Sequence, residues 1–430
     1  MATAIIGGGI SGLGAAYALR HDPDLVVFEA AQRAGGHANT ATVQGPDGTD
    51  IAVDTGFIVF NDRNYPNLVG LFQALGVATQ PSDMSFAASL RGGQVEYNGH
   101  SVFGLFAQPQ NLVRPRFLAM VRDVPRFFRL GRALLAQPVE PSLTMAAFLE
   151  RHRFSRAFVE DHLIPMAAAI WSAPPDEAMA FPAHSLCQFF ANHGLLSLTD
   201  RPEWRTVTGG SQSYVQKIAA ILGPRLRVGS PVTRVERRSG GVWVTARGQT
   251  ERFDRVIFAC HLDAAFSLLA DADGLEASIL TSFRTQANTA WLHSDTSLMP
   301  KRRRVWSAWN YLDQGAGPVA VSYWMNQLQS LDERLPLFVT LNPRQPPKPA
   351  LTHGRFQYRH PQFDSACLIA QQRIHEIQGY RGCWWAGAQL GYGFHEDGLA
   401  SGLRVALPLG GAVPWQSPEQ ASAHPLATAA

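Results

Sequence analysis

Three glycines near the start of the chain have the spacing of a phosphate-binding turn. Gly7, Gly9 and Gly12 lie between an apolar run at residues 4–6 and a longer stretch of small and apolar residues. In a βαβ unit the first glycine makes a tight turn, the second lets the backbone approach a pyrophosphate, and the third lets the helix pack closely on the strand. The N–H groups that open the helix, at Ile10 and Ser11, would then face the phosphates. A glycine-rich turn without a ligand is the alternative, because this motif alone is a weak signal.

Glu29 strengthens the dinucleotide interpretation. It directly follows a second apolar run, residues 25–28, and lies about twenty positions after the central glycine. A carboxylate there can accept hydrogen bonds from the ribose hydroxyls of an adenine dinucleotide. Because strand, turn, helix and spacing agree, the sequence predicts a dinucleotide-binding α/β unit that begins with the first strand.

The bulk composition is that of an ordinary globular protein. With 430 residues the chain is long enough for two domains, and its net charge of +3 is too small to imply nucleic acid as a partner. The four cysteines form no CxxC pair, which indicates thiols in a reducing compartment, and no metal is expected. The first strand leaves no room for a signal peptide, and no apolar run reaches the roughly 18 residues of a membrane span. We expect a cytoplasmic protein, soluble or peripheral on the inner membrane.

The residues from Glu29 onward resemble the FAD fingerprint of the flavin amine oxidase superfamily, which includes monoamine oxidases, protoporphyrinogen oxidase and phytoene desaturases. The block EAAQRAGG, residues 29–36, follows the three glycines as it does in those enzymes. The resemblance implies FAD as the cofactor, with an arginine that offsets the diphosphate charge. The block residues that it assigns to the cofactor are Glu29, Ala30, Arg33, Gly35, Gly36 and the next residue, His37. Those enzymes usually have arginine where this chain has His37, so the contact at that position is left open.

A second matching block lies at residues 384–406. Its strand, Ala-Gly turn and glycine–acidic segment resemble the part of the superfamily that closes the flavin site. A helix that begins near Glu396 would direct its N–H groups at the flavin pyrimidine ring and stabilise the negative charge of the reduced ring. Residues 228–238 resemble the return segment that meets the adenine, and residues 255–269 the strand that re-enters the dinucleotide domain. The further cofactor contacts implied are Thr55, Gly56, Phe57, Val232, Gly387, Phe394, Glu396 and Asp397.

A narrower resemblance is carried by residues 54–68, 300–311 and 391–398. They are similar to a bacterial subgroup of NAD/FAD-binding, amine-oxidase-like proteins that accompany cyclopropane-synthase-like methyltransferases of membrane fatty acyl chains. This resemblance implies a fatty acyl methyltransferase as a partner. No second GxGxxG follows a strand, so we expect no separate NAD(P)H site, and electrons would leave to oxygen, a quinone or another carrier.

The expected architecture is a Rossmann-like FAD-binding domain, of the glutathione-reductase and amine-oxidase type, interleaved with a mixed α+β substrate domain. This places the chain in the α/β class. We assign to the FAD-binding domain residues 1–70, 205–265 and 375–410. The substrate domain would take residues 71–204 and 266–374. Residues 411–430, rich in alanine, proline and serine, are expected to be a flexible tail.

An arginine-rich amphipathic stretch occupies residues 111–135. Two helical faces are expected, one of Arg122, Arg126 and Arg129 and one of Phe117, Val121, Val124 and Phe128. Pro125 would divide the stretch into two short helices or begin the second. One interpretation is a surface helix whose apolar face joins the core. The other is a patch that lies on an anionic membrane surface, with residues 301–304 (KRRR) in the same footprint.

Oxidation of a C–H bond also needs somewhere for a proton to go. His395 lies next to Phe394, where amine oxidases place an aromatic residue that faces the flavin, and it could take or relay a proton near neutral pH. Its alternative role is to bond backbone at the helix start. Glu396 is the second catalytic candidate, with anion binding at the helix start as its alternative. Of the remaining polar residues, Asn61 and Tyr65 are weaker pocket candidates, and Cys260 and His261 are expected to be structural.

The substrate prediction rests on what the chain lacks. Amine oxidases often carry a lysine that bonds water near flavin N5, but the only lysines, Lys217, Lys301 and Lys348, lie in segments expected at the surface. Those enzymes also favour tyrosine at the position of Phe394. These departures argue against amine oxidation and favour desaturase-like chemistry on an apolar substrate. Together with the resemblance to the subgroup that accompanies fatty acyl methyltransferases, they lead us to expect a desaturase or oxidase that takes a hydride from unsaturated or methyl-branched fatty acyl chains of membrane phospholipids. The alternatives are an amine or isoprenoid oxidoreductase, or a non-catalytic flavoprotein partner of a lipid-modifying complex.

Overall fold

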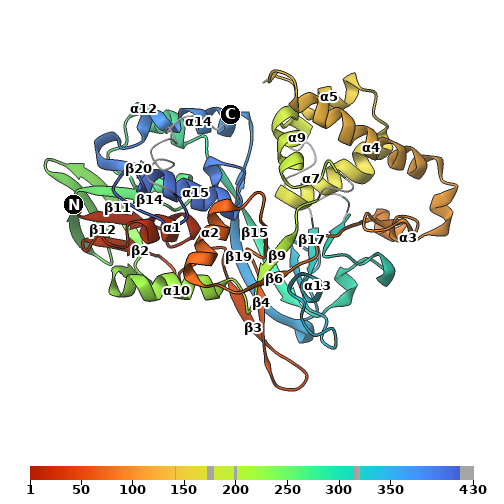
Figure 1. Ribbon diagram of the computed structural model, residues 1–430, viewed down its shortest axis with the longest axis horizontal. Coiled ribbons are helices and arrows are strands. Elements are labelled where there is room, and N and C mark those ends of the chain that lie inside the picture. The colour runs from red at the N-terminus through yellow and green to blue at the C-terminus, as the bar shows by residue number, and fades with distance from the viewer. Residues whose placement is uncertain (141, 172–178, 198–200, 314, 316–319, 417–430) are drawn as a thin grey trace.

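A five-stranded parallel sheet forms one half of the molecule (Figure 1). The computed structural model describes residues 1–140, 142–171, 179–197, 201–313, 315 and 320–416. Across the sheet the strands are β10 (Leu226–Arg227), β2 (Leu25–Phe28), β1 (Thr3–Ile6), β14 (Arg255–Phe258) and β20 (Cys383–Trp385). The central strands are almost continuously apolar, as parallel strands covered on both faces must be. As predicted, β14 re-enters beside β1 from far along the chain.

Both faces of this sheet are covered. Helices α1 (Ile10–Ala18), α2 (Pro66–Leu75), α10 (Gln212–Leu222) and α15 (His395–Ala406) share one apolar core with it. The opposite core contains an antiparallel sheet and two short helices. These are β11 (Val232–Arg238), β12 (Gly241–Ala246), β13 (Gln249–Phe253), α11 (Leu262–Leu268) and α12 (Gly274–Leu280). The sheet thus draws its strands from three separate parts of the chain, whereas the exact domain boundaries stay a prediction.

A seven-stranded mixed sheet organises the other half. Its order is β19 (Thr352–Gln362), β15 (Arg284–His293), β18 (Phe338–Leu341), β17 (Ala320–Trp324), β16 (Trp309–Leu312), β7 (Phe86–Leu90) and β8 (Val95–Asn98). Two small antiparallel sheets lie between the halves in Figure 1. One is the hairpin of β3 (Thr40–Gln44) and β4 (Asp50–Asp54), and the other joins β5 (Val59–Asn61), β9 (Trp204–Val207) and β6 (Thr79–Pro81).

A group of helices stands above and beside the seven-stranded sheet in Figure 1. It contains α3 (Val102–Leu105), α4 (Pro115–Leu135), α5 (Met145–Arg151), α6 (Arg156–Phe158), α7 (Ile164–Trp171) and α9 (Ala183–Asn192). A π-helical turn, Val159–Leu163, separates α6 from α7. Within the described residues no helix is both long and apolar enough to cross a bilayer.

Helix α4 corrects two predictions. It is one helix of 21 residues with Pro125 inside it, not two helices divided at that residue. Its buried face runs through Phe117, Met120, Asp123 and Phe127, so the expected apolar face of Val121, Val124 and Phe128 is only half-buried. The buried face of the helix differs from the predicted one because the carboxylate of Asp123 turns inward and accepts a hydrogen bond from the Ser155 N–H at 2.8 Å.

The arginines of α4 do not form the uniform outer face that was expected. The guanidinium of Arg126 stands over the Phe154 ring at 4.6 Å and donates to the His152 carbonyl. It also lies 3.5 Å from the Asp123 carboxylate. Arg126 therefore folds back onto the protein, while Arg122 and Arg129 stay exposed.

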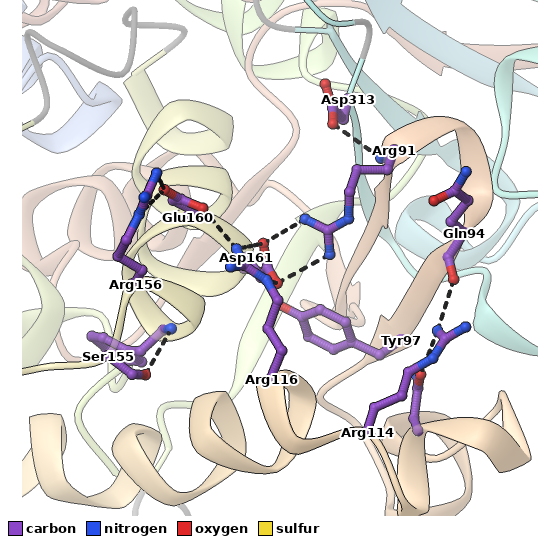
Figure 2. A network of polar contacts seen from close by, with 12 residues as sticks. Arg91, Gln94, Tyr97, Arg114, Arg116, Ser155, Arg156, Glu160, Asp161 and Asp313 are labelled. Carbon is purple, nitrogen blue, oxygen red and sulfur yellow. Dashed lines mark hydrogen bonds and ion pairs between the residues drawn. The ribbon is translucent and has the colours of Figure 1, made fainter.

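An ionic network joins the helical group to the seven-stranded sheet (Figure 2). Asp161, in the π-helical turn, accepts two hydrogen bonds from Arg91, which follows β7, and two from Arg116 on α4. The Tyr97 hydroxyl, on β8, donates to the Asp161 carbonyl at 2.6 Å. One buried carboxylate thus connects the sheet, α4 and the helices around the π-helical turn.

The start of the predicted flexible tail is packed. Trp415 stacks on Tyr17 of α1 with ring centroids 5.9 Å apart, and the Ala412 N–H donates to the Ala18 carbonyl. The order arises because Val413 and Trp415 bury apolar surface against α1 and α2. Residues 417–430 lie outside the described residues.

Candidate functional site

The glycine turn after β1 is shaped by two different demands. A Cβ at Gly7, where φ is +114°, would lie 2.8 Å from the Ala259 backbone, and a Cβ at Gly12 would overlap the Gly7 carbonyl oxygen. A Cβ at Gly9, by contrast, would meet nothing within 4 Å. Gly9 is also the N-cap residue of α1, and its helix end has no side-chain cap. The turn therefore presents an open backbone surface and uncapped N–H groups, as phosphate binding requires.

Glu29 lies beside this turn. Its carboxylate accepts hydrogen bonds from the Gly8 and Ala31 N–H groups, each at 2.7 Å. The Ser230 N–H donates to the Glu29 carbonyl, so the segment that leads to Val232 runs next to Glu29 and the exposed Ala30. These contacts fix the carboxylate while leaving it acceptor capacity for a ribose.

The paired glycines and Arg33 close the other side of the turn. The Gly35 N–H donates to the Gly8 carbonyl at 2.7 Å, and a Cβ at Gly36 would lie 3.2 Å from the Gly9 Cα. Arg33 donates to the carbonyls of Ala34, Gly36 and Ala38. Its guanidinium thus orders the loop around Gly36, and its predicted role toward a diphosphate stays a prediction.

Helix α15 packs across the start of α1. A Cβ at Gly398 would lie 2.8 Å from Ile10 Cγ2 and 3.0 Å from Ser11 Oγ. The side chains of Ile10 and Ser11 are therefore buried against α15, and only their backbone N–H groups are available to a phosphate. Gly387, which follows β20, donates its N–H to Ser401 Oγ of the same helix at 3.0 Å.

A polar cluster lies next to the turn. His37 stacks on Tyr358 and His360 of β19, with ring centroids 5.0 and 5.4 Å away. Its carbonyl accepts the Phe57 N–H, and a Cβ at Gly56 would overlap that carbonyl. The Thr55 hydroxyl lies 2.7 Å from the Tyr358 hydroxyl. Residues 55–57 are therefore held against His37, and their predicted contact with the cofactor stays a prediction.

Two nitrogen atoms of this region are buried without a hydrogen-bond partner among the described residues, His37 Nε2 and Gln389 Nε2. The side-chain oxygen of Gln389, Oε1, lies 3.4 Å from His261 Nδ1. The His261 ring in turn approaches the His37 ring edge-on. Burial holds the pKa values of His37, His261 and His360 below the ordinary histidine value, to about 4 for His360. Buried polar atoms usually have partners, and a flavin ring edge offers both donors and acceptors, so the residues present fit a bound flavin.

His395 is buried between two aromatic side chains. Its ring lies parallel to Phe57 at a centroid distance of 3.7 Å, and its Nε2 is 2.8 Å from the Tyr214 hydroxyl. Burial lowers its pKa to about 3, so the imidazole is neutral at physiological pH. His395 is thus a hydrogen-bonded partner of Tyr214, and its predicted role in proton transfer stays a prediction.

Glu396 accepts hydrogen bonds from a helix other than its own, and its predicted catalytic role stays a prediction. One carboxylate oxygen accepts from the N–H and the side-chain amide of Asn67, and the other from the Leu68 N–H. These donors open α2, so Glu396 neutralises the positive end of that helix. The neighbouring Asp397 accepts the Phe394 N–H at 2.8 Å and closes the first turn of its own helix. Burial raises the pKa of Asp397 to about 7.

Phe394 belongs to an aromatic wall made of Phe189, His193, Trp204, Tyr392 and Phe394. Phe189 stacks on Phe394 and on His193, at 5.1 and 3.9 Å, and His193 stacks on Trp204. Burial lowers the pKa of His193 to about 4, so every member of the wall is neutral. Apart from Phe394, the sequence analysis did not identify the residues of this wall as neighbours, because α9, β9 and the segment before α15 come together only in the folded chain.

The two weaker pocket candidates make contacts within the fold, and their predicted place in a pocket stays a prediction. Asn61 Oδ1 accepts the N–H groups of Arg63 and Asn64, and Tyr65 is buried against Phe60 and Trp204. Burial raises the pKa of the Cys260 thiol to about 12, which fits the structural role expected for it. His261, expected to be structural, instead faces the polar cluster.

The three lysines make their contacts away from the polar cluster and the aromatic wall. The Lys217 ammonium donates to the carbonyls of Leu75 and Gly76 at the end of α2. The side chain of Lys301 lies beside Gly93, and Lys348 lies beside Asp295. None of these contacts involves the polar cluster or the aromatic wall.

Comparison with known proteins decides the family. The profile of the flavin-containing amine oxidoreductases matches residues 10–406. The chain belongs to this family. The predictions of the superfamily and of a flavin cofactor, FAD, are therefore confirmed.

Relatives and solved structures agree with the assignment. The chain is 28% identical over 262 residues to a Mycobacterium tuberculosis protein that carries the name flavin-containing monoamine oxidase AofH, which is 57% of this chain and 54% of that protein. The chain spans about half the length of the curated relatives it matches. Among solved structures, a redesigned putrescine oxidase superposes with a TM-score of 0.68 at 18% identity, covering 95% of this chain and 98% of the other. A fatty acid isomerase from P. acnes gives 0.64 at 16% identity, with 93% and 96% covered. The predicted fold class is confirmed.

Proposed function

We propose that this member of the family is an FAD-dependent oxidoreductase that removes a hydride from an allylic carbon of an unsaturated or methyl-branched fatty acyl chain. The observation that carries the proposal is the neutral aromatic wall around Phe394. When bound, FAD supplies the hydride acceptor. The neighbouring acyl carbon loses a proton, so the substrate gains one C=C bond and gives up one hydride and one proton.

The wall favours an apolar substrate. The two carboxylates next to the wall, Glu396 and Asp397, already accept hydrogen bonds from backbone N–H groups. Among the described residues, no lysine contacts the wall. A protonated amine would lose its hydration there and gain no partner of opposite charge. An acyl chain would bury apolar surface against Phe189 and Phe394 and exclude water.

The chain's own polar groups have matching roles. Neutral His395, bonded to Tyr214, is too weak a base to hold the proton permanently, so we assign to this pair the relay of the proton. The backbone at Gly9, Glu29 and the cluster around His37 would hold FAD. The fold itself does not choose the substrate, since it is shared by proteins named putrescine oxidase and fatty acid isomerase.

Amine oxidation is the second candidate, because relatives found by sequence are named flavin-containing amine or monoamine oxidases. Anaerobic mixing of the oxidised holoenzyme with phospholipid or with putrescine, followed by flavin absorbance, separates the two. Methyl-branched and straight-chain unsaturated phospholipids are compared, since the sequence resemblance points to a fatty acyl methyltransferase as a partner. Bleaching by lipid alone supports the proposal, and bleaching by putrescine alone overturns it. No bleaching by either would favour a non-catalytic flavoprotein.

A matched pair of variants tests the wall. Phe394→Ser opens it and should slow reduction by lipid at least about tenfold, the cost of roughly 1.5–3 kcal/mol of apolar contact. Glu396→Gln, two residues further along the chain and outside the wall, should leave that rate within about twofold. FAD content measured for both variants separates a loss of cofactor from a loss of substrate contact.

A further inference from the structure

We propose that the end of the molecule around α3 docks on the surface of a membrane that contains anionic phospholipid. The docking surface combines an apolar tip with a basic rim. The tip consists of Val102, Phe103, Leu112, Val113 and Leu118, and the rim of Lys301, Arg303 and Arg304. The proposal stands on exposed side chains of this region and does not depend on the substrate.

The apolar tip is exposed to an unusual degree. Phe103 is 90% exposed, Val113 77% and Val102 72%, and Leu112 and Leu118 are also exposed. They come from α3, from a 3-10 turn (Pro109–Leu112) and the residue that follows it, and from the first turn of α4. Single exposed apolar residues are common, but a cluster of large ones indicates a contact with another apolar phase.

The inner side of the same segment is firmly held. Ser101 caps α3 through a hydrogen bond from the Gly104 N–H at 3.0 Å, and Phe106 packs edge-on against Phe117 at 5.9 Å. A Cβ at Gly104 would overlap the Asn98 side chain at the end of β8. The tip is therefore a supported projection at one end of the long axis (Figure 1).

The positive charge around the tip indicates that its binding partner is an anionic membrane surface. Residues 97–122 and 296–312 contain no aspartate or glutamate. The Asn98 amide donates to the carbonyls of Arg304 and Val305, which places the basic run beside the tip. Lys301, Arg303 and Arg304 are exposed, and none of the ion pairs between described residues involves their side chains. Arginine binds phosphate strongly, so this combination fits an anionic lipid headgroup region with shallow insertion of Phe103 and Val113.

This location differs from the middle of α4, the surface that its arginines had indicated. There Arg126 is turned onto Phe154 and Asp123, and Phe127 faces the core. The middle of α4 therefore has no apolar face to insert, whereas the tip has both components.

Vesicle co-sedimentation of the holoenzyme tests the proposal. The probes are vesicles of phosphatidylcholine alone and of phosphatidylcholine with 30% phosphatidylglycerol, a composition of about one anionic lipid in three. Binding should need the anionic lipid and should weaken at high salt. Val102→Ser with Phe103→Ser should reduce it at least about tenfold, and Arg303→Gln with Arg304→Gln about 30-fold, the effect expected for two near-surface arginines.

Two controls are matched to these variants. Ile369→Ser removes a large exposed apolar residue on α14 (Ser365–Arg373), outside the tip, and Arg129→Gln with Arg132→Gln removes two arginines from the far end of α4. Both should bind like the unchanged protein. FAD content and thermal midpoint show that each variant is folded. Equal binding to neutral vesicles, no binding to either, or an equal loss in either control would overturn the proposal. An equal loss in the Arg129→Gln with Arg132→Gln variant alone would place the docking surface on α4.

Discussion

Individual glycines of the first turn serve different purposes, and the structure separates them. Gly7 and Gly12 are needed by the protein itself, because a side chain at either position would strike backbone. Gly9 lacks any neighbour within reach of a Cβ, and its φ of −78° suits any residue. A requirement for glycine at position 9 can therefore come only from a ligand.

Gly9→Ala and Gly12→Ala test this at the scale of one methyl group. Gly9→Ala should leave the thermal midpoint of the FAD-free protein unchanged but weaken FAD binding roughly 5- to 150-fold, the effect of about 1–3 kcal/mol of overpacking against the pyrophosphate. Gly12→Ala should lower the midpoint of the FAD-free protein as well. Calorimetry on both proteins with and without FAD measures the two effects, and a normal FAD affinity in Gly9→Ala would mean that the diphosphate lies elsewhere.

At this scale the sequence was informative only where a motif fixes the spacing. Glu29 lies beside the glycine turn, as its spacing from the glycines predicted. Tyr358 and His360, which stack on His37, carry no such signal. They belong to β19, whose half-buried pattern mixes polar and apolar residues, and their relation to His37 exists only after the two halves of the molecule pack together.

A helix end accounts for the hydrogen bonds of Glu396, the acidic residue predicted as a catalytic candidate. Glu396 satisfies the first N–H groups of α2, which no side chain of that helix caps. The sequence placed Glu396 correctly at the start of a helix, but it could not show that the helix it serves is a different one.

Glu396→Gln distinguishes capping from catalysis. The amide keeps one acceptor but loses the charge, so the free energy of unfolding should fall by about 1–2 kcal/mol. The rate of flavin reduction should stay within about twofold. If Glu396 were the base, the rate would fall 10²- to 10⁴-fold at unchanged stability. Denaturant unfolding and single-turnover reduction on the same preparation give both quantities.

The π-helical turn anchors the helical group through one residue. Burial alone would raise the pKa of Asp161, but hydrogen bonds from Arg91 and Arg116 hold this pKa below the usual value. Asp161→Asn should therefore lower the stability by about 1–3 kcal/mol, since both guanidinium groups lose a charged acceptor. Glu160→Gln is the matched control, because Glu160 is 38% exposed and an exposed ion pair contributes less than about 1 kcal/mol. Equal midpoints for the two variants in denaturant would contradict the anchoring role in Figure 2.

Over the whole molecule, two sets of buried groups respond oppositely to acid. Burial lowers the pKa of several histidines to about 4 or below, namely His162, His193, His293, His360 and His395. Burial raises the pKa of Asp54 to about 6 and of Asp397 to about 7. The sequence shows how many histidines the chain has. It does not show which of them are buried, because their burial depends on how two cores and an aromatic wall pack together, and no local sequence pattern encodes that packing.

These shifts set the pH dependence of stability. Above pH 6.5 the histidines are neutral in both states, and below it the unfolded chain takes up protons that the folded chain refuses, so stability falls as the pH drops from about 6.5 toward 4. At pH 5 fully buried His293 and nearly buried His395 should each cost about 2 kcal/mol. Asp54 and Asp397 act the other way, because the folded state keeps protons that the unfolded state has released. The histidines outnumber them, so we expect the thermal midpoint to be lower at pH 5 than at pH 7. His395→Phe should reduce that difference, whereas exposed His375→Phe should not; a midpoint that rises on acidification would show that the carboxylates dominate.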